Sequence, residues 1–124
     1  MSIAALKFVS DTLDSLGINY QFGEWSTNPV PNPYFVGEYT EPESLTRGED
    51  GFQETSFILT GTGTNWLKLE EAKATIENNV SKTAILSNGN GIAVFYAGSL
   101  TVPTGDAKLK RIQINLTIKE WSVN

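Results

Sequence analysis

The sequence predicts an α+β fold, in which two helices pack on one face of a mostly antiparallel sheet of about five to six strands. Two segments show apolar residues at spacings of three and four, which is typical of helices, whereas several others alternate apolar and polar residues, as half-buried strands do. No repeat or linker divides the 124 residues. The order α-β-β-β-α-β-β therefore indicates a single domain over residues 1–124, because two helices cannot cover both faces of so many strands.

The first helix is expected over residues 3–16, where one apolar stripe is formed by Ile3, Leu6, Val9, Leu13 and Leu16. Gly17 follows as a left-handed stop. Residues 18–22 then alternate apolar and polar side chains, which predicts a short half-buried strand. Residues 28–33 contain three prolines and are expected to be a stiff extended connector, since proline has no N–H to donate to a strand partner.

Residues 34–60 predict a long β-hairpin that projects from the fold. Its first strand covers residues 34–40, and its second begins near Phe52, with Thr55, Phe57 and Leu59 on one face. The segment between them, residues 41–51, is polar, acidic and rich in turn-forming residues.

The second helix is expected from Trp66 to Asn79, capped by Thr64 or Asn65. Its buried side is predicted to be Trp66, Leu69, Ala72, Ile76 and Val80. A short strand over residues 83–86, a turn at 88–91 and a central strand over 92–97 follow, the last continuing or bending at a bulge toward Val102. The clearest strand covers residues 111–119, where Ile112, Ile114, Leu116 and Ile118 alternate with polar residues.

The chain contains no histidine and no cysteine, which removes many functions. Histidine is the usual proton shuttle at neutral pH and the commonest metal ligand, and cysteine is the strongest protein nucleophile and the structural zinc ligand. A Ser-His or Cys-His catalytic pair, a zinc finger and a disulfide framework are therefore impossible. We predict that the protein is not an enzyme and has no catalytic, metal or cofactor site.

The charge is acidic overall and unevenly distributed. The net charge is −5, which disfavours nucleic-acid recognition because such binding rests on Lys and Arg neutralising phosphates. Residues 24–54 hold seven acids against Arg47 alone, whereas residues 108–124 hold four bases against Glu120 alone. No stretch of about 20 apolar residues is present and the N-terminus lacks a secretory pattern, so we expect no membrane partner.

Three possible binding or catalytic sites have plainer explanations. Gly61-Thr62-Gly63 precedes a helix but lacks the third glycine of a dinucleotide site and the Gly-Lys-Ser/Thr of a P-loop, which favours a simple turn. The acidic segment lacks the alternating ligands of a calcium loop, and its paired carboxylates alone do not predict glycoside hydrolysis. Charged contact surfaces are the better interpretation, with candidate interface residues Glu41, Glu43, Glu49, Asp50, Lys108, Lys110 and Arg111.

The whole-chain layout resembles that of the small tail-terminator proteins of long-tailed bacteriophages, also called tail-completion or minor tail proteins. The resemblance rests on the helix ending Leu16-Gly17, the strand Ile18-Asn19-Tyr20-Gln21-Phe22 and the projecting hairpin from Phe35-Val36-Gly37-Glu38 to Phe57-Ile58-Leu59. The helix from Trp66 to Asn79 and the C-terminal strand pair complete it. It covers nearly the whole chain, as a likeness of layout and size.

The resemblance implies a structural virion assembly protein of the tail or neck, present in the host cytoplasm during assembly. Such proteins form a homo-oligomeric ring, commonly of six subunits, on the tail tube, where they end its polymerisation and provide the head-joining surface. Tube and head-connector proteins are then the partners. The separated acidic and basic segments favour a head-to-tail contact between copies, the type that closes into rings. Another neck connector or adaptor, a small carboxylate-based enzyme and a ligand-binding domain remain alternatives.

Overall fold

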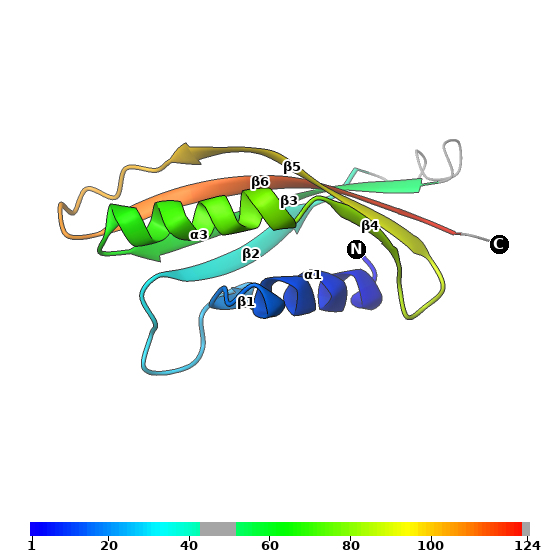
Figure 1. Ribbon diagram of the computed structural model, residues 1–124, viewed down its shortest axis with the longest axis horizontal. Helices are drawn as coiled ribbons and strands as arrows, with labels where there is room; N and C mark the ends of the chain where they lie inside the picture. The colour runs from blue at the N-terminus through cyan, green and yellow to red at the C-terminus, as the bar shows by residue number, and fades with distance from the viewer. Residues whose placement is uncertain (43–51, 123–124) are drawn as a thin grey trace.

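The computed structural model describes residues 1–42 and 52–122 as one six-stranded sheet with two helices (Figure 1). The strands are β1 (Tyr20–Phe22), β2 (Tyr34–Thr40), β3 (Phe52–Gly63), β4 (Lys82–Ile85), β5 (Gly91–Thr101) and β6 (Lys110–Trp121). Their order across the sheet is β1-β2-β3-β6-β5-β4. Every neighbouring pair is antiparallel except β1 and β2, which run parallel. The predicted α+β class and element order are confirmed, with the strand after the second helix present as β4.

Both helices contribute to one core on a single face of the sheet. Helix α1 (Ile3–Ser15) packs Val9 against β5 and β6, and helix α3 (Trp66–Asn79) buries Leu69 and Ile76 in the same cluster. Along β6 the residues with even numbers, from Ile112 to Glu120, are buried, while the odd-numbered ones are half-exposed. The described part of the chain therefore leaves the second face of the sheet open to solvent.

The local signals read from the sequence have clear structural counterparts. Gly17 adopts φ +76° directly after α1, as a left-handed stop requires. Asn65, one of the two predicted caps, accepts hydrogen bonds from the N–H groups of Leu67 and Lys68 at 2.8 and 3.4 Å. The expected bulge of β5 lies between Tyr96 and Ser99.

Three expectations about buried side chains are wrong. Ile3 is 86% exposed and Trp66 is 41% exposed, although both continue an apolar stripe. Each is the first residue of its helix, where the apolar face extends past the side chains that cover it. Phe22 is also exposed, at the edge strand β1, and lies against Tyr39 and Phe57 with ring centroids 5.9 and 6.4 Å away.

The long β3–β6 ladder separates the two ends of the molecule. Phe52 pairs with Trp121 at one end and Gly63 with Lys110 at the other. At a rise of roughly 3.3 Å per residue, this ladder spans about 36 Å. The end of β2, the start of β3 and the N-terminus lie toward the first end, whereas the start of α3 and the β5–β6 connection lie at the second (Figure 1).

Candidate interaction surface

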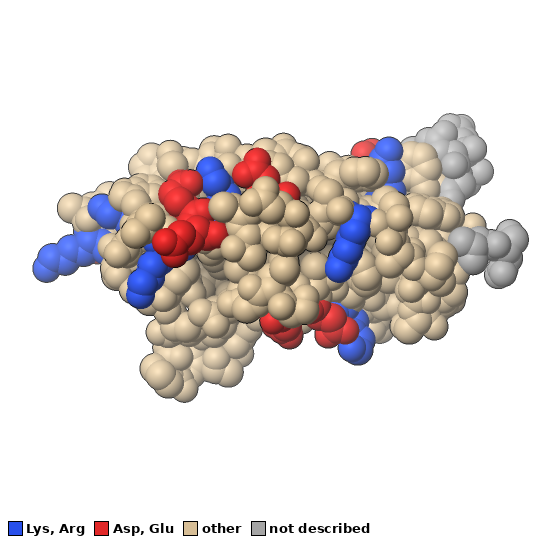
Figure 2. Space-filling model, viewed as in Figure 1, with Lys and Arg blue, Asp and Glu red and all other residues tan. Residues whose placement is uncertain are grey.

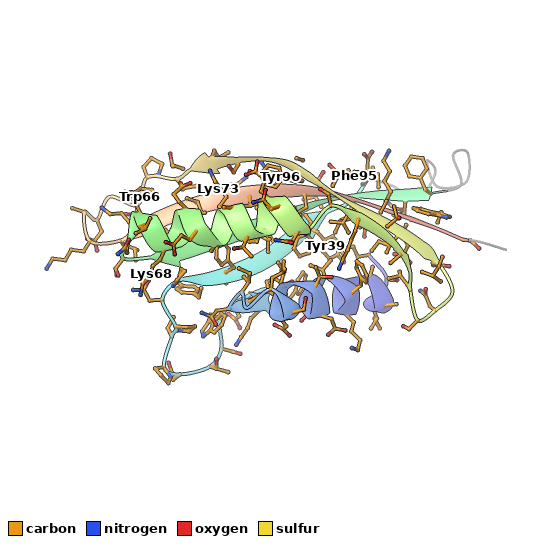
Figure 3. The ribbon with its side chains drawn as sticks, in the orientation of Figure 1. Tyr39, Trp66, Lys68, Lys73, Phe95 and Tyr96 are labelled. Atoms are coloured by element: carbon orange, nitrogen blue, oxygen red, sulfur yellow. The ribbon has the colours of Figure 1, made fainter. Side chains whose placement is uncertain are left out.

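The start of α3 and the β5–β6 connection together form a surface that we call the basic end, defined by Trp66, Leu67, Lys108 and Lys110. The Lys110 Nζ lies 5.9 Å from the centre of the Trp66 ring, which joins the two segments through a cation–π contact. Leu67, the next residue of α3, is 66% exposed. Figure 2 shows Lys and Arg side chains extending from this end of the molecule, at the left, and Figure 3 shows Trp66 and Lys68 at the start of α3.

The local sequence fixes Trp66 and Leu67 in place. Asn65 has an extended backbone and caps α3, so the next two residues begin the helix. The side chain of Asn32 ties the proline-rich connector to this cap: it accepts from the Thr64 N–H at 3.1 Å and donates to the Thr64 hydroxyl at 2.6 Å. Gly63 allows this close approach, because a Cβ there would lie 2.7 Å from the Asn32 side chain.

The β5–β6 connection is also held by its own hydrogen bonds. The Thr104 hydroxyl donates to the Leu109 carbonyl at 2.8 Å, and the Asp106 carboxylate accepts from the Lys108 N–H at 2.9 Å. The Lys110 ammonium donates to the Ala107 carbonyl at 2.6 Å. The two lysines are therefore presented by an ordered loop, which reduces the entropy lost when a partner binds.

Arg111 was predicted to share this surface, but it lies on the other face of the sheet. Its Nε donates to the Thr62 hydroxyl at 3.2 Å, and its side chain borders a hollow of about 250 Å³ that Glu38 also lines. Strand alternation explains the separation, since neighbours in β6 point to opposite faces. The predicted basic patch is thus divided between the helix-covered face and the open face.

Of the four predicted acidic interface residues, only Glu41 is among the described residues, and it is bonded within the chain. It pairs with the N-terminal ammonium of Met1 and accepts from the Thr55 hydroxyl at 2.9 Å. Glu43, Glu49 and Asp50 lie outside the described residues. Their predicted role at an interface stays a prediction.

Glu120 is a buried carboxylate that the sequence reasoning treated only as one charge among bases. It is 5% exposed and accepts from the Ser2 hydroxyl at 3.0 Å and the Asn90 amide at 2.8 Å. Burial raises the pKa of Glu120, but these hydrogen bonds outweigh burial and leave that pKa below its usual value. The sequence did contain a signal for this burial. Glu120 stands at the next even-numbered position after Ile112, Ile114, Leu116 and Ile118, so strand alternation places it on the same apolar face.

The hollows of the surface give little support to carboxylate catalysis. One of about 250 Å³ is bordered by Glu41 and Glu120, but the pKa of Glu120 is lowered, whereas a general acid needs a raised one. A groove of about 300 Å³ lies between the end of α1, the start of β2 and α3. Among residues 1–42 and 52–122, no group of three or more acidic side chains gathers as a metal site would require.

The simple turn expected at Gly61-Thr62-Gly63 is wrong, because these residues belong to strand β3 and pair with β6, and they do not form a phosphate-binding turn. The Phe35 ring packs directly on Gly61, where a Cβ would lie 2.4 Å from that ring. Glycine is needed at this position for close packing inside the sheet. In the described part of the chain, no helix is long and apolar enough to cross a membrane.

No protein-family model and no curated protein matches this chain.

Proposed function

We propose that this protein is a structural virion assembly protein that forms a ring on the end of a phage tail tube. The ring ends tube polymerisation and provides the surface that joins the head, with the tube and head-connector proteins as partners in the host cytoplasm. The layout of two helices on one face of a sheet with a long hairpin supports the resemblance to tail terminators on which this proposal rests. No cofactor takes part.

One observation carries the oligomeric part of the proposal: Thr40 and Phe52, which stand on either side of the acidic segment in the sequence, lie toward the end of the sheet opposite to Lys110. The ladder from Phe52 to Gly63 spans about 36 Å at ~3.3 Å per residue, which is more than the short segment between Thr40 and Phe52 can bridge to reach Lys110 of its own chain. The acidic segment and Lys110 can meet between two copies arranged head to tail, which is the heterologous contact that closes into rings. The charges orient this contact and speed association, while buried apolar area supplies most of its free energy.

A charge-swap experiment tests the head-to-tail contact. The first variant carries Lys108→Glu and Lys110→Glu, and the second carries Glu43→Lys, Glu49→Lys and Asp50→Lys. Each variant alone should sediment as smaller species than the wild type, because the two facing surfaces then repel each other. An equimolar mixture should regain the wild-type oligomer, because every contact between unlike chains pairs opposite charges.

The matched control reverses two lysines that lie away from the basic end, Lys7→Glu with Lys82→Glu, and should sediment like the wild type. Sedimentation at low and high salt completes the test, since screening weakens charge pairing. The head-to-tail contact would be refuted if the variant with Lys108→Glu and Lys110→Glu sediments like the wild type. It would also be refuted if the equimolar mixture of the two variants stays dissociated.

The tail function is tested by electron microscopy of tubes grown from a phage tail-tube protein. Tubes polymerised with the protein present should be shorter and should end in a terminal ring. Tubes of unchanged length without an end structure would contradict the tail-terminator proposal. Binding to a head connector as a single subunit would favour the adaptor alternative.

A further inference from the structure

Two large apolar side chains at the basic end are exposed, and one of them, Trp66, contacts Lys110. Trp66 is 41% exposed and Leu67 is 66% exposed, and both belong to the first turn of α3. Tryptophan is enriched among the residues that carry most of the energy of protein interfaces. The ordered cap and loop around them mean that this surface needs little rearrangement to receive a partner.

The acidic segment of the chain has the composition that this surface requires. Between residues 43 and 51 there are three acids, Glu43, Glu49 and Asp50, against Arg47. One large apolar residue, Leu45, stands among them. This segment follows β2 at the far end of the ladder from Lys110, so the basic end that it meets must belong to a second molecule.

We propose that Trp66 and Leu67 are the apolar anchor at which a second copy docks residues 43–51, with Leu45 against the anchor and the carboxylates of Glu43, Glu49 and Asp50 against Lys108 and Lys110. This inference rests on the head-to-tail contact proposed above, but it does not require that the partner be a tail tube. The Lys110–Trp66 contact holds the cation beside the ring, so one docked segment engages both groups. The anchor thus makes the contact persist at salt concentrations that screen the charges.

The test compares two exposed aliphatic residues at different places on the surface. Leu67→Ser should raise the dissociation constant of the full-length chain about tenfold or more, as loss of an interface anchor does. Ile85→Ser is the matched control, because Ile85 is 68% exposed on edge strand β4, and it should leave the constant unchanged. Sedimentation equilibrium at high salt measures both, and circular dichroism verifies that each variant is folded.

A double-mutant cycle tests whether Leu45 of the second copy is the residue that docks against Leu67. Leu45→Ser should weaken association alone, and the combination with Leu67→Ser should weaken it by less than the product of the two single effects, as for residues in contact. Independent effects, or equal effects of Leu67→Ser and Ile85→Ser, would refute the anchor while leaving the charge contact standing. A wild-type chain that stays monomeric at every concentration and salt would overturn both proposals, whereas failure on the tube alone would overturn only the tail function.

Discussion

The two ends of the molecule use their polar side chains in different ways. At the end near the N-terminus, which we call the network end, Ser2, Glu41, Asn90 and Glu120 are hydrogen-bonded within the chain. At the basic end, Lys108 is exposed and Lys110 lies over a half-exposed tryptophan ring. A buried carboxylate must be fully hydrogen-bonded or it destabilises the fold, whereas an exposed lysine contributes little to stability. The network end therefore holds the fold together, and the basic end is available to a partner.

The network end joins three segments that are distant in sequence. The Ser2 hydroxyl accepts from the Ala5 N–H, which caps α1, and donates to Glu120 on β6. Asn90, in the turn between β4 and β5, donates to the other carboxylate oxygen. One side chain thus fixes the start of a helix and a turn against the central sheet.

The largest expected effect on stability is at Glu120. Glu120→Ala should lower the free energy of unfolding by about 2–3 kcal/mol, because it leaves the Ser2 hydroxyl and the Asn90 amide without their acceptor. Urea denaturation measures the change. Glu54→Ala, at an exposed position on β3, is the control and should change stability by less than about 0.5 kcal/mol. Equal effects of the two substitutions would show that the network does not stabilise the fold.

A smaller effect is expected at the cap beside the basic end. Asn65→Ala should cost about 1 kcal/mol of stability, because the N–H groups of Leu67 and Lys68 lose their acceptor. It should also weaken self-association, since Trp66 and Leu67 begin the helix that this cap positions. Asn78→Ala, at an exposed position near the other end of α3, should do neither. Weaker association without any loss of stability would mean that Asn65 itself contacts the partner.

The smallest effect is a pH dependence at the network end. The folded-state pKa of Glu120 is lowered, so its ionised form stabilises the fold above the usual glutamate pKa of about 4.3. That stabilisation is lost as the pH falls through the folded-state pKa, because protonation removes the acceptor. The stability difference between wild type and Glu120→Ala should therefore narrow below about pH 4, in urea denaturation followed from pH 7 to pH 3. If the stability difference between wild type and Glu120→Ala stays the same from pH 7 to pH 3, the substitution acts through lost packing and not through the ionised carboxylate.

The sequence predicted the elements well because their signals are local. Gly17 ends α1, Asn65 caps α3 and the alternation over residues 111–119 defines β6, and each signal acts through near neighbours in the chain. The candidate surface was predicted only in part. Lys108 and Lys110 were identified, but Arg111 was assigned to the same patch although strand alternation places it on the other face.

Trp66 shows why the rest of the surface was missed. Its spacing in the helix matches that of Leu69 and Ile76, so periodicity assigned it to the core. Whether a residue on an apolar stripe is buried depends on whether another segment covers it, and no segment within the described part of the chain covers the first turn of α3 fully. The exposure of Trp66 and Leu67 therefore depends on the tertiary structure, which shows that α3 begins at an end of the sheet.

The sequence by itself determined the α+β class, the helices and strands, and the absence of histidine and cysteine chemistry, because these follow from residue identity and short-range periodicity. Tertiary structure decided which charges meet. Pairing of β3 with β6 placed Phe52 and Lys110 at opposite ends of the sheet, and Glu120 meets Ser2 across 118 positions of the chain. Contacts of that range depend on how distant strands align, which no local pattern encodes.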